Sequence, residues 1–301
     1  MRKKIVLMVM AQVILWADLR DDYLALVNKY NEGTIYTEES LLYFRENSPF
    51  KSGISFDLYG VDFPTLQSEY LTLVKRMIRG ILDQTDVPEG DRPHNPKIMK
   101  EYAYTHCSGE AINTLRSLME DVERNHVPGD FVETGVWRGG LTIFMKAFLR
   151  AYGDQKRRVW VADSFEGWPP ATNDPDSLEC NNQKLPWIVV PEEVVKNNFK
   201  RCGLLDDKVV FLKGWFKDTL AVAPIEKIAI LRVDGDLYES TRDSLEALYP
   251  KLVTGGWVII DDYDYFPGCN RAVEEYRKAN NITGPVFRQG KTCSGICWKK
   301  T

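Results

Sequence analysis

The stretch Ile230–Thr241, "ILRVDGDLYEST", is an apolar run that ends in two aspartates one residue apart, Asp234 and Asp236. Further along the chain, Gly255–Asp264, "GGWVIIDDYD", repeats this pattern and ends its apolar run at Asp261–Asp262. Short apolar runs bounded by polar residues are typical of buried strands. If the two strands are parallel neighbours, their ends lie about 5 Å apart. The sequence then predicts that carboxylates from two strands converge at one place.

Length and composition limit the classes of protein to consider. The chain has 301 residues, of which 44% are hydrophobic and 27% charged, so it can form one large domain or a core domain with an appended segment. A net charge of −4 provides no strong field for nucleic acid, and we expect no nucleic-acid partner. The six cysteines are irregularly spaced without a CxxC pair, and three histidines are scattered. This pattern predicts reduced thiols in a cytoplasmic protein rather than a zinc site.

The N-terminal part, residues 1–95, is interpreted as an accessory or lid region. Its basic start precedes an apolar run, Ile5–Ala17, that is too short for a comfortable transmembrane helix and is either a buried element or a signal or anchor segment. No stable membrane insertion is expected. Apolar residues at helical spacing follow in 19–30 and 63–85. The proline-rich segment 86–96 is predicted to be the loop at the domain boundary.

From Gly129 onward, short apolar runs alternate with helical patterns. The predicted strands are 130–134, 157–165, 208–214, 227–236, 255–263, 285–289 and 294–300. The predicted helices are 108–126, 139–152, 191–203 (with Pro191 at its first position), 240–252 (capped by Ser or Thr) and 270–280. This order predicts an α/β fold with a doubly wound, mostly parallel sheet that ends in an antiparallel hairpin. Ligands of such sheets bind outside the carboxyl ends of the strands.

Polar residues and glycines follow the first three predicted strands. Glu133, Thr134 and Gly135 open a glycine-rich turn, which lacks the G-x-G-x-x-G pattern and on its own is equally a tight turn. Asp163 ends the second strand, where a carboxylate can accept hydrogen bonds from ribose hydroxyls or cap a turn. Gly214 and Trp215 follow the third strand, where aromatic rings could stack on an adenine or belong to the core.

The aspartates after the fourth and fifth strands, Asp234 and Asp261–Asp262, form the most specific pattern. Clustered carboxylates repel one another, and a hard divalent cation such as Mg²⁺ or Ca²⁺ offsets that cost. The alternative is that they cap the following helices or turns. Asp236 shares the side of Asp234 only if the strand continues past Gly235. Arg232 points to the same face as Asp234, which also fits a structural role.

Four segments resemble the macrocin-O-methyltransferase family, which consists of S-adenosylmethionine-dependent methyltransferases that act on sugar hydroxyls in antibiotic biosynthesis. They are "VPGDFVETGVWRGG" (127–140), "VWVADSFEGWP" (159–169), "LRVDGDLYESTRDSLEALYPKL" (231–252) and "GGWVIIDDYDYFPGCNRAVEEYR" (255–277). The resemblance extends from about Cys107 to about Trp298 and leaves residues 1 to about 90 without a family assignment.

The resemblance implies a Rossmann-like class I methyltransferase domain over 96–301, with a seven-stranded sheet. It also implies roles for individual residues. Glu133, Thr134 and Gly135 would lie near the methionine end of S-adenosylmethionine, Asp163 and Ser164 would hold the ribose, Gly214 and Trp215 would border the adenine, Asp234, Asp261 and Asp262 would bind Mg²⁺, and Asp234 would be the general base.

The expected reaction is Mg²⁺-dependent methyl transfer to one hydroxyl of a vicinal diol, with a sugar-bearing small molecule as the partner. A bound metal would lower the pKa of one hydroxyl, and Asp234 would accept its proton. A catechol-type acceptor, a nucleotide-linked oxidoreductase and a non-catalytic binding module are the alternatives. The polar, proline-rich segment 166–187 is interpreted as an active-site lid or as a disordered insertion. Homo-oligomerisation is left open.

Overall fold

The computed structural model of the protein describes most of the chain. The described residues are 15, 18–29, 63–79, 103–170, 180, 182–183, 185–291 and 293–301. The apolar run Ile5–Ala17, apart from Leu15, and the predicted boundary loop 86–96 therefore lie outside the described residues.

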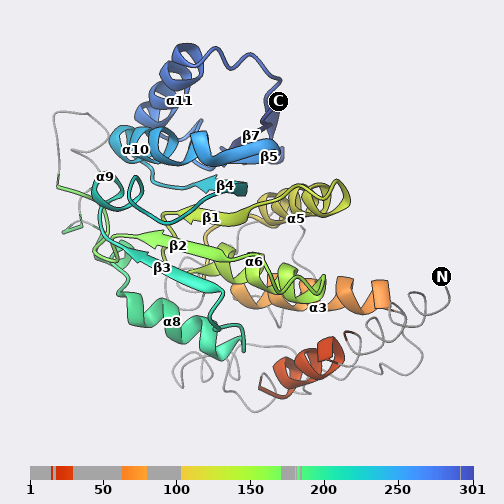
Figure 1. The fold of residues 1–301 in the computed structure, drawn as a ribbon. Helices are drawn as coiled ribbons and strands as arrows, with labels where there is room; N and C mark the ends of the chain where they lie inside the picture. The colour runs from red at the N-terminus through yellow and green to blue at the C-terminus, as the bar shows by residue number, and fades with distance from the viewer. Residues whose placement is uncertain are drawn as a thin grey trace.

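A seven-stranded sheet with the order β3-β2-β1-β4-β5-β7-β6 forms the centre of the molecule (Figure 1). Its strands are β1 (Asp130–Thr134), β2 (Val159–Asp163), β3 (Val209–Lys213), β4 (Ile228–Val233), β5 (Leu252–Ile260), β6 (Phe287–Arg288) and β7 (Ile296–Lys299). The first five strands are parallel, and β7 runs antiparallel to both β5 and β6. The predicted fold class is thereby confirmed, including the antiparallel C-terminal hairpin.

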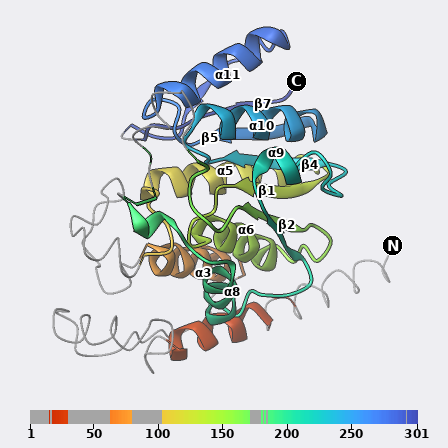
Figure 2. The same cartoon turned by 90° about the vertical axis from the view of Figure 1, so that its left-hand side faces the viewer.

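Helices cover both faces of the sheet (Figures 1 and 2). They are a helix over 18–29, α3 (Phe63–Ile78), α5 (Gly109–Arg124), α6 (Gly140–Ala151), η1 (Pro186–Ile188), α8 (Glu192–Arg201), α9 (Phe216–Thr219), α10 (Tyr238–Leu248), η2 (Tyr249–Lys251) and α11 (Pro267–Ala279). The N-terminal helices, α5, α6 and α8 share one hydrophobic cluster, whereas α10 and α11 share the other.

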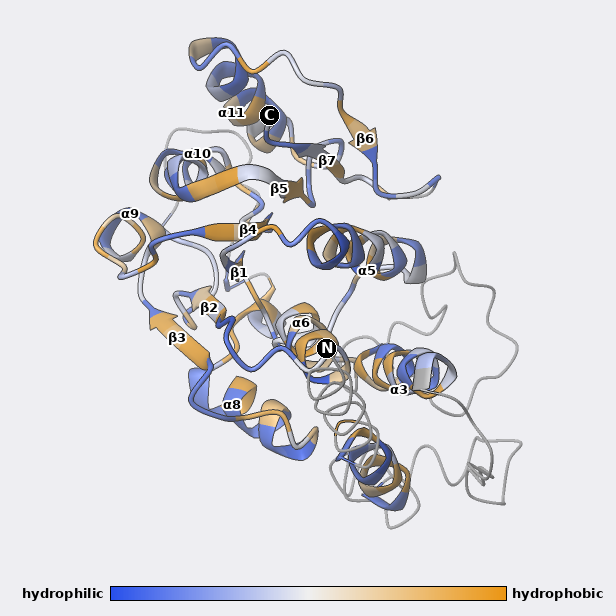
Figure 3. Ribbon diagram, turned by 45° about the vertical axis from the view of Figure 1, so that its right-hand side comes forward, coloured by the Kyte–Doolittle hydropathy of each residue, from blue (hydrophilic) through white to orange (hydrophobic). Residues whose placement is uncertain are grey.

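The strands are buried on both sides, which explains their continuous apolar runs. Successive residues of β1 enter opposite clusters, Phe131 on the side of α6 and Val132 on the side of α10, and Val161 and Ala162 of β2 do the same. Figure 3 shows hydrophobic colour on β3, β4 and β5, while the covering helices carry both colours. Two-sided burial fixes the register of the strands and hence the position of every residue that follows them.

Three predicted helix starts differ from the structure, and α11 begins at Pro267, three residues before its predicted start. α10 begins at Tyr238 with Leu237 at its N-cap, so Ser240 and Thr241 lie inside the helix and the predicted Ser or Thr cap is wrong. Pro191 occupies the N-cap of α8 rather than its first position. By contrast, Ser108, the first residue of the predicted helix 108–126, caps α5, because its Oγ accepts a hydrogen bond from the Ala111 N–H at 3.1 Å.

α3 packs against α6, whereas the helix over 18–29 lies beside α8 (Figure 2), and both extend the hydrophobic cluster of α6. Gln67 of α3 donates to the Ala151 carbonyl at 2.8 Å, and Asp22 pairs with Arg150 at 2.5 Å. None of the helices in the described part of the chain has both the length and the hydrophobicity required to cross a membrane. All six cysteines are described, and none forms a disulfide.

Candidate active site

A large cavity lies at the carboxyl ends of the parallel strands. Its volume is about 1340 Å³, and it is lined by residues that follow each of the strands β1 to β5. The predicted site residues on its wall are Glu133, Gly135, Asp163, Ser164, Gly214, Trp215, Asp234, Asp261 and Asp262. Thr134 is the exception, because it is fully buried and its hydroxyl accepts a hydrogen bond from Ser244 of α10 at 3.1 Å. Thr134 therefore contacts α10 rather than the cavity and stabilises the turn after β1.

The first turn brings the backbone of β1 against that of β4. Gly135 has φ of +81°, and a Cβ at this position would lie 1.7 Å from the Asp234 carbonyl oxygen. The Asp234 N–H in turn donates to the Thr134 carbonyl at 2.8 Å. Glycine is required for this close approach, which brings the turn after β1 next to the first aspartate of β4.

Asp163 ties the second strand to the first turn. One carboxylate oxygen accepts the Val136 N–H and the other accepts the Phe165 N–H, both at 2.8 Å. Burial raises the pKa of Asp163, while these backbone donors act in the opposite direction. Because a carboxylate offers about four lone-pair positions, Asp163 can still accept hydroxyl groups from a ligand.

Glycine and aromatic residues complete the rim at β3. Gly214 has φ of +138° and donates its N–H to the Asp163 carbonyl at 2.9 Å. Trp215, which follows it, lines the cavity at the N-cap of the short helix α9. Asp163 and Trp215 therefore both line the cavity, at the ends of the neighbouring strands β2 and β3.

Arg232 lies among three carboxylates that line the same cavity. Its side chain is only 2% exposed, and its guanidinium contacts three carboxylates: Glu133 at 2.5 Å, Asp234 at 2.6 Å and Asp261 at 2.6 Å. Its Nη2 also donates to the Cys107 sulfur at 3.1 Å. The three acids come from three adjacent strand ends, since β4 lies between β1 and β5. The alternation of strand residues predicted the direction of Arg232 but not these partners.

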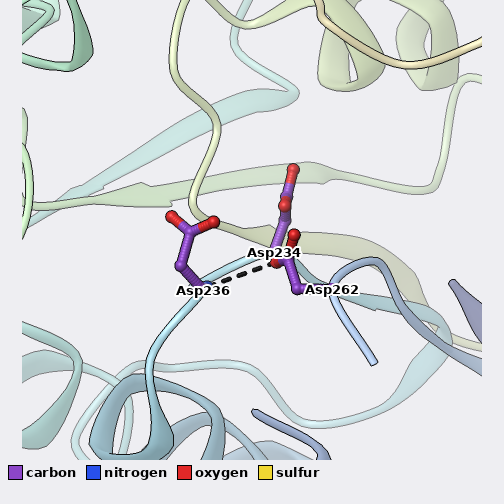
Figure 4. A group of neighbouring side chains, drawn as sticks. All are labelled: Asp234, Asp236 and Asp262. Carbon is purple, nitrogen blue, oxygen red and sulfur yellow. Dashed lines mark hydrogen bonds between the residues drawn. The ribbon is translucent and has the colours of Figure 1, made fainter. Parts of the chain in front are cut away.

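Asp234, Asp236 and Asp262 form a second group of carboxylates (Figure 4), which shares Asp234 with the partners of Arg232. Oxygens of Asp234, Asp236 and Asp262 lie within 4.8 Å of one another, and the Asp236 N–H donates to Asp262 Oδ2 at 3.3 Å. Asp236 has φ of +60°, so the chain turns sharply after Gly235 instead of continuing the strand. Asp234 and Asp262 thus belong both to the predicted metal set and to this group. Asp261 instead faces Arg232, and Asp236 is the third member.

The carboxylates around Arg232 carry more negative charge than its guanidinium can neutralise. Burial and the neighbouring carboxylates raise the pKa of Asp234, Asp236 and Asp262 above the usual range. Burial raises the pKa of Glu133 to about 8, although Arg232 opposes the shift. Glu133 Oε2 is buried and has no hydrogen-bond partner among the described residues. These features favour a ligand that brings positive charge and hydrogen-bond donors.

An aromatic group was missed by the reading of the sequence. The ring of His106 lies 4.0 Å from that of Trp137 and 5.1 Å from that of Trp187, and the Trp137 indole donates to the Trp187 carbonyl at 2.9 Å. All three residues line the cavity. They come from three separate segments with no shared periodicity, so only the fold could bring them together.

Comparison with solved structures identifies the class of protein. The structure of the O-methyltransferase NovP is 41% identical in sequence with a TM-score of 0.70, and the match covers 78% of this chain and 99% of that one. The calicheamicin methyltransferase CalS11 shares the fold, with 22% identity and a TM-score of 0.52 over 83% of this chain and 99% of its own. The fold is therefore that of a class I methyltransferase.

The model of the macrocin-O-methyltransferase (TylF) family matches residues 57–300, and the chain belongs to this family of O-methyltransferases. The match begins at residue 57 rather than near Cys107, so it includes α3. The sequence-based interpretation that residues 1 to about 90 lie outside the family likeness is therefore wrong from residue 57 onward.

Relatives of known activity support this assignment to O-methyl transfer. The 8-demethyl-8-(2,3-dimethoxy-alpha-L-rhamnosyl)-tetracenomycin-C 4'-O-methyltransferase of Streptomyces olivaceus is 44% identical, and the match covers 77% of this chain and 92% of that protein. The demethyldecarbamoylnovobiocin O-methyltransferase of Streptomyces niveus is 41% identical over 78% and 94% of the two chains. The mycinamicin III 3''-O-methyltransferase of Micromonospora griseorubida is 40% identical over 77% and 96%.

Proposed function

We propose that the protein transfers the methyl group of S-adenosylmethionine to one hydroxyl of a vicinal diol, on a sugar of a small natural product. Mg²⁺ would bind at the acidic wall, the part of the cavity lined by Asp234, Asp236, Asp261 and Asp262. The observation that carries this proposal is the group of Asp234, Asp236 and Asp262 in the same cavity as the glycine turn of β1. A relative named for a rhamnosyl compound supports the sugar as acceptor.

The wall of β1, β2 and β3 suits the methyl donor. S-adenosylmethionine supplies an electrophilic sulfonium methyl together with an ammonium, a ribose and an adenine. The unpartnered Oε2 of Glu133 could accept a hydrogen bond from the ammonium, and Asp163 could accept hydrogen bonds from the ribose hydroxyls. Trp215 offers a ring beside the adenine position. These residues bind and orient the donor and take no part in bond making.

The acidic wall suits a hard cation. Its carboxylate oxygens are the ligand type that Mg²⁺ prefers, and no other group of potential metal-binding side chains was found in the described part of the chain. Asp234, Asp236 and Asp262 would hold the ion. Asp261, a predicted ligand, remains a fourth candidate that would have to leave Arg232. When bound, Mg²⁺ would orient two vicinal hydroxyls and lower the pKa of one.

Asp234 is proposed as the general base. Arg232 holds Asp234 Oδ2 at 2.6 Å, which fixes the direction of the carboxylate, and 27% of the side chain remains exposed. Burial and Asp261 raise its pKa, so the carboxylate is a better proton acceptor than an ordinary aspartate. Asp234 would therefore take the proton of the hydroxyl that attacks the methyl group.

The cavity is large enough for both reactants. Sites for single small ligands usually measure about 300–1,000 Å³, whereas this cavity measures about 1340 Å³. The donor leaves room for a sugar and part of the attached molecule. The aromatic group of His106, Trp137 and Trp187 offers apolar surface for such an acceptor.

Two measurements test the proposal. Calorimetry should show that the protein binds S-adenosylmethionine and a divalent cation and does not bind NAD. Methyl transfer from labelled donor should then be compared between rhamnosides with a free vicinal diol, the same rhamnosides with one hydroxyl blocked, and a catechol. The proposal expects transfer to the free diol and its loss after chelation of the metal. Binding of NAD without S-adenosylmethionine, or transfer that continues after chelation, would contradict it.

A further inference from the structure

Trp168 contacts the acidic group directly. Its indole Nε1 donates to Asp236 Oδ2 at 2.6 Å, although the two residues belong to different segments, one after β2 and one after β4. Both residues line the cavity. The bond leaves Asp236 Oδ1 and the remaining lone pairs of Oδ2 for other ligands.

Asp236 needs such support for two reasons. Its φ of +60° is a conformation that residues other than glycine rarely adopt, so its backbone is strained. Its carboxylate also lies beside those of Asp234 and Asp262, which repel it. Without a fixed donor, rotation of the side chain away from its neighbours would relieve this repulsion. The indole N–H opposes that rotation without adding a charge that would compete with a cation.

The turn that carries Trp168 is itself held firmly. The Trp168 N–H donates to Asn182 Oδ1 at 2.9 Å, and Asn182 Nδ2 donates back to the Trp168 carbonyl at 3.0 Å. Ser164 Oγ donates to the Gly167 carbonyl at 2.8 Å and accepts the Glu166 N–H at 3.0 Å. Main-chain bonds on both sides of the residue fix where its indole lies.

We propose that Trp168 is a positioning residue that holds the Asp236 carboxylate in the acidic group and so completes the site for the divalent cation. This proposal rests on the proposed function. It concerns the cation site rather than the donor site, because Asp163 at the start of the same turn binds its own backbone partners independently of Trp168.

The protein provides a matched control. Trp257 of β5 also donates its indole N–H to an aspartate, Asp121 of α5, at 2.8 Å, and neither residue lines the cavity. Trp168→Phe and Trp257→Phe therefore remove the same type of bond, one inside the site and one outside it. A loss of cation affinity confined to Trp168→Phe cannot come from the general loss of an indole donor.

The experiment measures Mn²⁺ binding by calorimetry, without acceptor, for wild type, W168F, W257F, D236N and the double variant W168F/D236N. Loss of a group that orients a metal ligand typically lowers affinity about 10- to 100-fold. We expect W168F to weaken Mn²⁺ binding by about tenfold, W257F to leave it unchanged, and S-adenosylmethionine binding without metal to be unchanged in both. The double variant should resemble D236N alone, because Trp168 acts through Asp236.

Asn182→Ala is a second route to the same result, since it frees the backbone of Trp168 without changing the indole. It should weaken Mn²⁺ binding in the same direction, and thermal unfolding of each variant shows that it is folded. Mn²⁺ binding by W168F equal to that of wild type, or additive losses in the double variant, would overturn the role of Trp168 alone. Absence of Mn²⁺ binding by the wild-type protein would refute the proposed metal and, with it, this inference.

Discussion

The two ends of the central sheet each contain a largely buried arginine, and the two arginines have different surroundings. At the amino end, Arg157 is 12% exposed, donates to the carbonyls of Gly129 and Val127, and pairs with Asp154 and Glu123. At the carboxyl end, Arg232 is 2% exposed and contacts three carboxylates. One of them, Asp234, also belongs to the group with Asp236 and Asp262.

This difference separates a structural role from a functional one. Arg157 satisfies backbone carbonyls that would otherwise be left without donors, which is a contribution to stability. Arg232 neutralises only part of the charge around it, and an excess of buried negative charge is costly unless a ligand compensates it. Carboxylates in a cavity whose charge is incompletely neutralised therefore indicate a functional site, whereas an arginine whose hydrogen-bond partners are all satisfied indicates a structural role.

The largest expected effect is a loss of turnover when an aspartate at the carboxyl end of the sheet is replaced, compared with an aspartate at the amino end. Asp234→Asn should lower the turnover number by about 10³-fold, because loss of a general base typically costs 10²- to 10⁴-fold, and should leave S-adenosylmethionine binding largely intact. Asp130→Asn is the control, since Asp130 accepts hydrogen bonds from Trp160 and the Arg158 N–H at the amino end. Methyl transfer and calorimetry on both variants test this. Unchanged turnover in D234N would remove Asp234 from the mechanism.

Replacing each arginine by methionine should lower stability, and added Mg²⁺ should affect the two variants differently. Arg232→Met breaks buried ion pairs and should lower the free energy of unfolding by about 3–5 kcal/mol. Arg157→Met leaves the partly buried carbonyls of Gly129 and Val127 without this donor and should cost about 2–4 kcal/mol. Added Mg²⁺ should restore stability more in R232M than in R157M, because it offsets the acids that Arg232 had neutralised. Urea unfolding with and without Mg²⁺ measures this, and equal recovery would contradict the comparison.

The succession of strands along the chain, the mostly parallel sheet and the antiparallel hairpin could be predicted, because two-sided burial produces apolar runs at regular spacing. The same rule placed the aspartates after β4 and β5 in one cavity. Alternation of side chains left Asp236 undecided, because it applies only while the backbone is extended, and the chain turns at Asp236 with φ of +60°. The partners of Arg232 come from three strands, and Trp168 comes from a fourth segment. Such contacts depend on side-chain geometry, which spacing does not encode.

Asp236 and Asp261 provide a finer test of that geometry. Asp236→Asn should weaken Mn²⁺ binding by about tenfold, because Asp236 belongs to the group whose oxygens lie within 4.8 Å. Asp261→Asn should change Mn²⁺ affinity less and stability more, since Asp261 pairs with Arg232. Calorimetry and thermal unfolding of both variants decide between the two arrangements. If D261N shows the greater loss of affinity, Asp261 exchanges Arg232 for the ion and the sequence-based ligand set is the correct one.

The last expected effect is a pH dependence of stability that arises from Glu133 and the aspartates at the carboxyl end of the sheet. Burial raises the pKa of Glu133 from its usual 4.5 to about 8, so the folded protein binds a proton that the unfolded chain releases. The stability that this group contributes is present below about pH 4.5 and is lost as the pH rises through about 8. Without divalent cations, urea unfolding should therefore show decreasing stability between about pH 5 and 8. Glu133→Gln should reduce this slope, because glutamine does not titrate, while Asp234, Asp236 and Asp262, whose pKa values burial also raises, keep part of it. Saturating Mg²⁺ should reduce the slope further by offsetting the negative charge. A slope that persists unchanged in E133Q would show that other groups cause it.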